Sequence, residues 1–386
     1  MRSERLTDRL FRQRTPHGTP VTPFELFFDL VYVFAVTQLA HGLAEHFTVA
    51  GAAQTLLLLS AVWWAWMYTS WTTNWFHPDH VAVRLTLVGV MLASLVMAAA
   101  IPSAFDGRGL WFAGAYAAIQ VGRSLFVAVA ARSHALGPTF QRILAWHSFT
   151  AVVWIAGGLA DGPAGAVLWT AALALEYAAP WHGYTTPFLG RSHTSEWTID
   201  AEHMAERCRL FMLIVLGESL LVAGATFSGA QPSAGRVAAF LSAFTAAVAL
   251  WWIYFHRAAD AAGERIAASG DPGRLGRSAY TYLHVPMIAG VIVTAVAVKT
   301  TIAHPTGTVT AGTACAILGG PLLFLAGHLL FTRAVFGHLS RSRLLALAAL
   351  AALGLTTAIA TPLMLMGGAA AVLLSVAAGE LRGGEG

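Results

Sequence analysis

Long apolar stretches separated by short polar ones run through almost the whole chain. A helix needs about 20 mostly apolar residues to cross a bilayer. Stretches that approach or reach this length lie at 24–46, 49–74, 82–103, 109–131, 140–160, 164–182, 207–228, 235–256, 280–300, 311–333, 342–357 and 359–379. The last two are separated at 357–362, where a proline offers a turn. The pattern therefore predicts an all-α integral membrane protein with about twelve transmembrane helices.

Composition supports a bilayer as the partner of this chain. Of its 386 residues, 57% are hydrophobic and 11% are charged, and the mean hydropathy is +0.64. Soluble domains average about 25% charged residues. So little polar surface excludes a water-soluble globule, and so many apolar residues exclude a disordered chain.

The distribution of basic residues predicts the orientation. With the N-terminus inside, every Lys and Arg falls in a cytosolic loop or span end except Arg108, Arg123, Arg236 and Lys299. Cytosolic loops of membrane proteins are enriched in these residues. The chain is therefore expected to be N-in and C-in. Residues 1–23 are expected to form a basic cytosolic arm. Outside this arm the sequence has no compact basic face, so no nucleic-acid partner is predicted.

Similar polar and aromatic features recur in the two halves of the chain in the same order. The pairs are Glu25 and Glu206, 37–39 and 218–220, and 63–68 and 251–254. Six spans per half would give both copies the same orientation, as in parallel-repeat transporters. We therefore predict a first six-helix repeat at 24–182, a cytosolic linker at 183–206 and a second six-helix repeat at 207–382.

Ionisable residues inside the apolar stretches are the candidate functional groups, because charges in a bilayer are costly. Glu25 and Asp29 share one helix face, and Glu218 lies near the middle of its span. These three are the candidate proton carriers or general acids. Candidate substrate-binding residues are Arg84, Arg123, His203, Glu206, Arg207, Ser219 and His284. Their depths predict a polar vestibule open to the cytosol with Glu218 at its deep end. For any single residue, a static ion pair between helices is the alternative.

One face of the second stretch is aromatic. Trp64, Tyr68, Trp71 and Trp75 fall at i, i+4, i+7 and i+11. The first three are candidate substrate-binding residues, because ring faces can hold an apolar or cationic ligand. Helix packing is the alternative for them, and enrichment of Trp at the membrane interface explains Trp75.

Two polar loops carry residues that can bind metal ions. One holds His77, Asp79 and His80, and the other has His203 and Glu206 at i, i+3 spacing. Acidic residues also suit the first turn of a helix, and neither loop has a specific ligand motif. No metal and no cofactor is therefore predicted.

Three motifs resemble the bacterial low temperature requirement protein A family. They are residues 21–35, residues 200–207 leading to 215–219, and the Tyr282-x-His284 sequence. Residues 208–211 are more polar than is usual for the family. The resemblance implies a multi-pass protein of the bacterial inner membrane, without fixing a reaction or a substrate. It places emphasis on Glu25, Asp29, Arg84, His203, Glu206, Arg207, Glu218 and Ser219.

Three functions fit these features. The first is a secondary transporter of a small molecule, with or without proton coupling, in which Arg84 or Arg123 modulates the proton affinity of a carboxylate or pairs with a substrate anion. The second is an integral-membrane, cyclase-like enzyme that uses a carboxylic general acid on a lipid or isoprenoid. The third is a membrane scaffold or sensor whose ion pairs only hold helices together.

Overall fold

The computed structural model describes residues 10–12, 19–160, 162–194, 197, 199–256 and 258–382. Most of the predicted basic arm, at 1–9 and 13–18, lies outside these residues, as does Arg257. The described parts of the chain consist of helices and loops, with isolated β-bridges at Phe11 and Phe76 and at Thr186 and Gly190. The predicted all-α class is confirmed.

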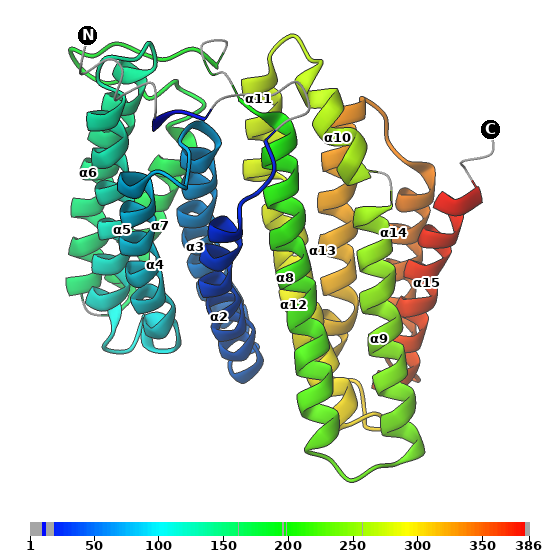
Figure 1. Cartoon of the computed structure of the whole chain (residues 1–386). Coiled ribbons are helices and arrows are strands. Elements are labelled where there is room, and N and C mark those ends of the chain that lie inside the picture. Colours follow the sequence, from blue (N-terminus) through cyan, green and yellow to red (C-terminus); the bar gives the residue numbers. More distant parts are fainter. Residues whose placement is uncertain are drawn as a thin grey trace. The chain divides into compact units, whose positions relative to one another are not determined.

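The helices follow the predicted apolar stretches closely. In chain order they are α2 (Pro23–Glu45), α3 (Val49–Trp75), α4 (Val81–Ala100) with η1 (Ile101–Ser103), α5 (Gly109–Ala130), α6 (Gly137–Leu159), α7 (Pro163–Ala178), α8 (Ala201–Ser228), α9 (Ala234–Phe255), α10 (Ala258–Ala267), α11 (Pro272–Gly276), η3 (Arg277–Tyr282), α12 (His284–Ala303), α13 (Ala311–Phe336), α14 (Arg341–Leu353), η4 (Gly354–Thr356) and α15 (Pro362–Arg382) (Figure 1).

Nine helical segments of the described chain are long and apolar enough to cross a membrane. They are α2, α3, α4 with η1, α5, α8, α9, the segment from α11 through α12, α13 and α15. Helices α6, α7 and α14 occupy the other three predicted spans, but they are not among the helices that are long and apolar enough to cross a membrane. Helix α7 has 16 residues and α14 has 13, both below the length of about 20 that a perpendicular span needs. A multi-pass membrane protein is therefore confirmed, while the count of twelve spans and the N-in, C-in orientation remain predictions.

The beginning of α2 follows from its sequence. Thr22 precedes Pro23, whose fixed φ suits the first helical position. The Thr22 backbone N–H donates to Glu25 Oε2 at 2.9 Å, and the Glu25 N–H donates to Thr22 Oγ1 at 3.3 Å. This reciprocal capping box satisfies two backbone donors that the first turn of a helix leaves free. It also fixes Glu25 at the very start of α2.

The chain divides into two compact units. The first comprises residues 1–39, 53–207 and 267–276, and the second comprises 40–52, 208–266 and 277–386. Helices α2 and α8 each begin in the first unit and end in the second. Helix α8 begins at Ala201, before the predicted span start at 207. The proposed six-plus-six repeat remains a prediction.

In the first unit, α4, α5, α6 and α7 pack against one another in sequence order (Figure 1). Small residues bring α5 and α6 close together: a Cβ atom on Gly158 would lie 2.9 Å from the carbonyl oxygen of Gly109. Large aromatic side chains fill the interior, among them Trp64, Trp154 and Trp169, which are fully buried. Close backbone packing between small residues is typical of helices in membranes.

In the second unit, α12 packs closely on α13, and α9 packs on α15. Gly290 of α12 faces Gly320 of α13, where a Cβ atom on Gly290 would lie 2.6 Å from the Gly320 carbonyl oxygen. Helix α13 ends at Gly337, whose φ of 80° lies in the left-handed region that favours glycine at this position. The turn predicted at 357–362 separates η4 from α15.

Candidate functional site

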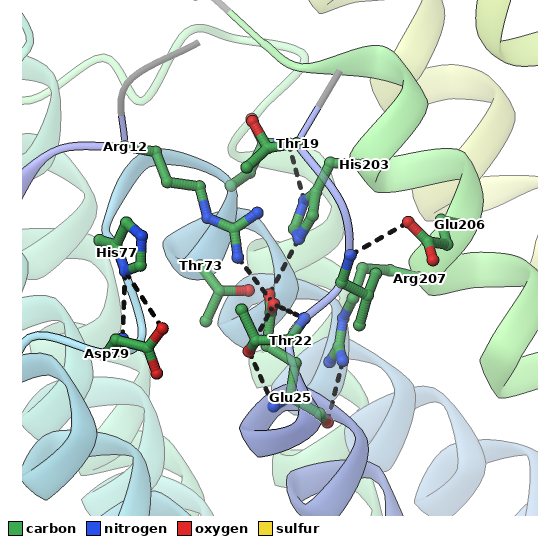
Figure 2. Close-up of polar contacts among 12 residues, drawn as sticks. Arg12, Thr19, Thr22, Glu25, Thr73, His77, Asp79, His203, Glu206 and Arg207 are labelled. Carbon is green, nitrogen blue, oxygen red and sulfur yellow. Dashed lines mark hydrogen bonds and ion pairs between the residues drawn. The ribbon is translucent and has the colours of Figure 1, made fainter. Parts of the chain in front are cut away.

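A buried polar cluster lies in the first unit where the N-terminal segment meets the ends of three helices. Its ionisable members are Arg12 from the N-terminal segment, Glu25 and Asp29 from α2, and His203 and Arg207 from α8. Helix α3 contributes Trp66, Ser70 and Asn74. We refer to these eight residues as the ion cluster; Figure 2 shows the part of it around Glu25. Four of the predicted site residues, Glu25, Asp29, His203 and Arg207, thus lie together.

Glu25 is the centre of one half of the cluster (Figure 2). Its Oε2 accepts hydrogen bonds from Arg12 Nη2 at 2.7 Å and from the Thr22 hydroxyl at 3.0 Å, in addition to the capping bond from the Thr22 backbone. Its Oε1 lies 2.9 Å from His203 Nε2. Bonds from charged donors are about twice as strong as neutral ones. Glu25 therefore ties the N-terminal segment to both α2 and α8.

The neighbours of His203 determine which ring nitrogen carries the hydrogen. The Asp200 backbone N–H donates to Asn74 Oδ1 at 3.0 Å, which orients the Asn74 amide. Asn74 Nδ2 then lies 3.1 Å from His203 Nδ1 and donates to it. Since Nδ1 accepts, Nε2 must carry the hydrogen that His203 donates to Glu25. A neutral His203 imidazole therefore satisfies both hydrogen bonds, accepting at Nδ1 and donating from Nε2.

Asp29 and Arg207 form the other half of the cluster. Arg207 donates from Nη2 to Asp29 Oδ1 at 2.8 Å and from Nη1 to Oδ2 at 2.9 Å, a bidentate pair. Trp66 Nε1 donates to the same Oδ1 at 2.7 Å. The guanidinium also donates to the Glu25 backbone carbonyl at 3.0 Å and lies over the Trp66 ring at 5.4 Å. Arg207 therefore links α8 to both halves of the cluster.

The segment before α2 is held to α8 through backbone donors. The Thr19 N–H donates to Asp200 Oδ2 at 2.9 Å, and the Val21 N–H donates to Glu206 Oε2 at 3.1 Å. Asp200 also caps α8, because its Oδ1 accepts from the His203 N–H at 3.0 Å. The predicted site residue Glu206 therefore lies beside the cluster as an acceptor for this segment.

The cluster is electrically balanced and closed. Two carboxylates face two guanidinium groups, and the side chains of Glu25, Asp29, His203 and Arg207 are at most 1% exposed. An open hydrated vestibule at these residues is therefore not seen. Burying charged groups is costly unless they are paired and hydrogen-bonded. Each carboxylate here is paired with an arginine, while Arg12 Nε and Nη1 and Arg207 Nε have no hydrogen-bond partner among the described residues. Separating either carboxylate from its arginine would leave two uncompensated charges.

Removing the Arg12 guanidinium is expected to release the N-terminal segment. In Arg12→Gln, the backbone amides of Thr19, Val21 and Thr22 should exchange hydrogen about 10- to 100-fold faster, the size expected for a lost hydrogen bond to a charged group. Hydrogen-exchange mass spectrometry of the detergent-solubilised protein measures this. Arg84→Gln serves as a control. Equal exchange in wild type and Arg12→Gln would show that Arg12 does not hold this segment.

Arg84 does not join the ion cluster. Its Nη2 donates to Asp79 Oδ1 at 2.6 Å, and both side chains are about half exposed. The guanidinium also lies 5.5 Å from the centre of the Phe24 ring. Exposed pairs of this kind contribute about 0–1 kcal/mol. The structure therefore places Arg84 in a surface pair beside the start of α2.

Arg123 and the predicted aromatic face lie in a second buried network of the first unit. Arg123 Nη1 donates to the Ala65 carbonyl at 3.1 Å, and its guanidinium lies over the Tyr68 ring at 5.4 Å. Trp64 stacks on Tyr177 with ring centres 4.1 Å apart. Trp71, also buried, packs edge-on against Trp197. Tyr68 therefore contacts both Trp64 and Arg123, whereas Trp71 contacts Trp75 and Trp197.

The sequence interpretation missed several polar residues of the first unit. Trp66, Ser70 and Asn74 recur at i, i+4 and i+8 on one face of α3, a spacing that could have indicated a polar face beside the aromatic one. Glu176 of α7 is also not among the predicted site residues. It accepts hydrogen bonds from Thr150 and Trp154, and it belongs to the same network as Arg123.

Glu218, Ser219 and His284 belong to the second unit. All three are buried. His284 Nδ1 donates to the Ala279 carbonyl at 2.9 Å, so its Nε2 accepts from the Tyr254 hydroxyl at 2.8 Å. The hypothesis that Glu218 shares a cavity with Glu25 and Asp29 remains a prediction.

A groove of about 570 Å³ on α4 and α5 has apolar walls that include Gly89, Trp111 and Gly114, and it contains no predicted site residue. Among the residues that the structure describes, no three His, Cys, Asp or Glu side chains are grouped to hold a metal ion. Both ring nitrogens of His203 are engaged by Asn74 and Glu25.

Comparisons with known proteins agree with the motifs. Residues 20–378 match the family described as Bacterial low temperature requirement A protein (LtrA). A protein of Rhizobium meliloti (strain 1021), described as the uncharacterized protein RA0937, is 41% identical over 312 residues, which cover 80% of this chain and 76% of that protein. No solved structure matches the chain significantly. The chain belongs to the bacterial low temperature requirement A family.

Proposed function

We propose that this protein is a proton-coupled secondary transporter of the bacterial inner membrane, and that the ion cluster closes its cytosolic side in the conformation described here. The observation that carries the proposal is the closed set of two carboxylates and two guanidinium groups at the starts of α2 and α8. A transporter that alternates between two open states must break such contacts in every cycle, and ionisable groups at membrane depth commonly mark ion and substrate paths.

Proton binding would open the cluster by changing its charge balance. A proton on Asp29 would remove one negative charge and leave Arg207 without its bidentate partner. A proton on Glu25 would do the same to Arg12. An arginine freed in this way would attract an anionic group of a small-molecule substrate, because a buried unpaired cation is strongly unfavourable. Proton binding and substrate binding would then favour the same open state.

Reconstituted protein provides the test. Proteoliposomes would be examined by solid-supported-membrane electrophysiology against amino acids, carboxylic acids, organic cations and sugars, with and without an imposed pH gradient. Wild type is expected to give a solute-dependent current that grows with an inward proton gradient. Asp29→Asn should lose at least about 90% of the gradient-driven current, because the asparagine side chain cannot bind and release the proton.

The matched control is Asp79→Asn, which removes a carboxylate from the exposed pair with Arg84. This variant should retain the wild-type current. A current in Asp29→Asn that responds to the gradient as wild type does would exclude Asp29 from coupling. A correctly folded wild type without current for any of these solutes would argue against transport itself.

A further inference from the structure

Glu176 of α7 is a further buried carboxylate of the first unit, and none of the arginines that the structure describes forms a direct ion pair with it. Its side chain lies in the interior, where Thr150 Oγ1 donates to Oε1 at 2.7 Å and Trp154 Nε1 donates to Oε1 at 3.1 Å. The Tyr116 hydroxyl donates to Oε2. Three neutral donors from α5 and α6 thus take the place that Arg12, His203 and Arg207 occupy in the ion cluster.

A chain of hydrogen bonds connects Glu176 to the nearest guanidinium. Arg123 Nη2 donates to Gln120 Oε1, and Gln120 Nε2 donates to the Tyr116 hydroxyl oxygen at 2.9 Å. Tyr116 in turn donates to Glu176. All three donors point from the cation toward the carboxylate, so each polarises the next. The charge of Glu176 is therefore balanced through two neutral side chains.

Other ionisable groups surround this chain on each packed element. His147 of α6 bonds through Nδ1 to Ser124 Oγ of α5 at 2.7 Å, and its ring meets the Tyr68 ring of α3 edge-on. Tyr177 follows Glu176 on α7 and stacks on Trp64. Of the groups around this chain, Tyr116 and Arg123 of α5 act on Glu176 itself, whereas His147 is in the field of Arg123.

The contacts of Glu176 suit both of its protonation states. In the ionised state it accepts from three donors. With a proton on Oε1, the carboxyl group could donate to Thr150 Oγ1, and the Thr150 hydroxyl could turn to the His147 carbonyl, which lies 3.3 Å away. Tyr116 would keep donating to Oε2. A buried carboxylate without a direct cation is costly in low dielectric, whereas the three donors stabilise it.

We infer that Glu176 is a reversible proton-binding site inside the first unit, distinct from the ion cluster. If the proposed transport function holds, Glu176 binds a coupling proton in addition to the proton that opens the ion cluster, which acts as the gate. This assignment differs from the sequence hypothesis, which placed the proton on Glu25, Asp29 or Glu218. Proton exchange at Glu176 involves no other bond change than the O–H bond formed and broken.

Infrared difference spectroscopy tests the proton site without a substrate. The full-length protein in lipid would be titrated from alkaline to acidic pH while the C=O stretch of a protonated carboxyl group is recorded. Wild type should gain this band on acidification, and Glu176→Gln should lose it. Glu25→Gln, the matched carboxamide change in the ion cluster, should keep it.

Tyr116→Phe provides a second test of the proton site that does not depend on whether Glu176→Gln folds. This variant removes one donor to the ionised carboxylate and leaves the proton-bearing oxygen unchanged, so the midpoint of the band should move about one to two pH units higher. Three results would each overturn the proton site. The band could be unchanged in Glu176→Gln, it could be absent from folded wild type, or its midpoint could be unshifted in Tyr116→Phe.

Flux measurements separate this inference from the proposed function. In proteoliposomes, Glu176→Gln should carry solute without response to the pH gradient. A Glu176→Gln current that still follows the gradient would overturn the coupling assignment. A wild type that shows the Glu176 band but carries no solute would contradict the transport proposal and leave the proton site standing.

Discussion

Arg207→Gln is expected to destabilise the protein by about 3–5 kcal/mol. The substitution removes the bidentate partner of Asp29 and leaves that carboxylate buried with only the neutral Trp66 donor. Breaking one side of a buried ion pair has an effect of about this size, because the remaining charge is uncompensated. Thermal unfolding of the detergent-solubilised protein, followed by tryptophan fluorescence, measures the loss.

The double variant Asp29→Asn with Arg207→Gln separates the ion pair from the packing of the two side chains. Removing both charges leaves neutral amides of similar size, so part of the lost stability should return. Arg84→Gln is the matched control for losing an arginine from an exposed pair, and it should cost about 0–1 kcal/mol. A double variant less stable than either single variant would contradict the ion-pair explanation.

The course of the helices could be predicted from the sequence because hydrophobic length is a local property. Each predicted apolar stretch contains a helix. The number of spans is harder to predict from the sequence, which gives about twelve where nine helical segments of the described chain are long and apolar enough. Helices α7 and α14 end after 16 and 13 residues, and whether a short helix crosses a bilayer depends on its neighbours and its tilt. Start positions depended on capping residues such as Asp200, which begins α8 earlier than its apolar stretch does.

The ion cluster could be predicted in part. Glu25 and Asp29 share a face of α2, and His203 and Arg207 share a face of α8, so each pair was visible from helical spacing. That the two pairs meet depends on contacts between residues far apart in the chain, for example Arg207 with Asp29. Arg84 carries the same charge as Arg207, but it pairs with Asp79, which is close to it in sequence, and not with a carboxylate of the ion cluster.

The Glu176 network shows what spacing cannot reveal. Glu176, Thr150 and Tyr116 come from three different helices, and each alone is an ordinary polar residue in an apolar stretch. The hydrogen bonds among them depend on the order of packing of α5, α6 and α7. Burial also decides the chemistry, since the same carboxylate on a surface would ionise without any partner.

Gly320→Ala is expected to destabilise the second unit by about 3 kcal/mol, at the upper end of the range for overpacking. A Cβ atom at this position would lie 2.8 Å from the Thr294 backbone nitrogen and 2.9 Å from the Gly290 carbonyl oxygen. Both are backbone atoms of α12, so a side-chain rotation cannot relieve the contact. Helix α12 would have to move away from α13, with loss of close packing along the pair.

The neighbouring glycine provides the matched control for Gly320→Ala. Gly319 precedes it in the same helix, and a Cβ atom on Gly319 would meet no atom within 4 Å. Gly319→Ala should therefore leave the thermal unfolding temperature unchanged or raise it slightly, because alanine favours a helix by about 0.5–1 kcal/mol over glycine. Equal unfolding temperatures for the two variants would show that α12 and α13 do not require contact at Gly320. A lower temperature for Gly320→Ala alone would establish that a backbone approach between these helices stabilises the second unit.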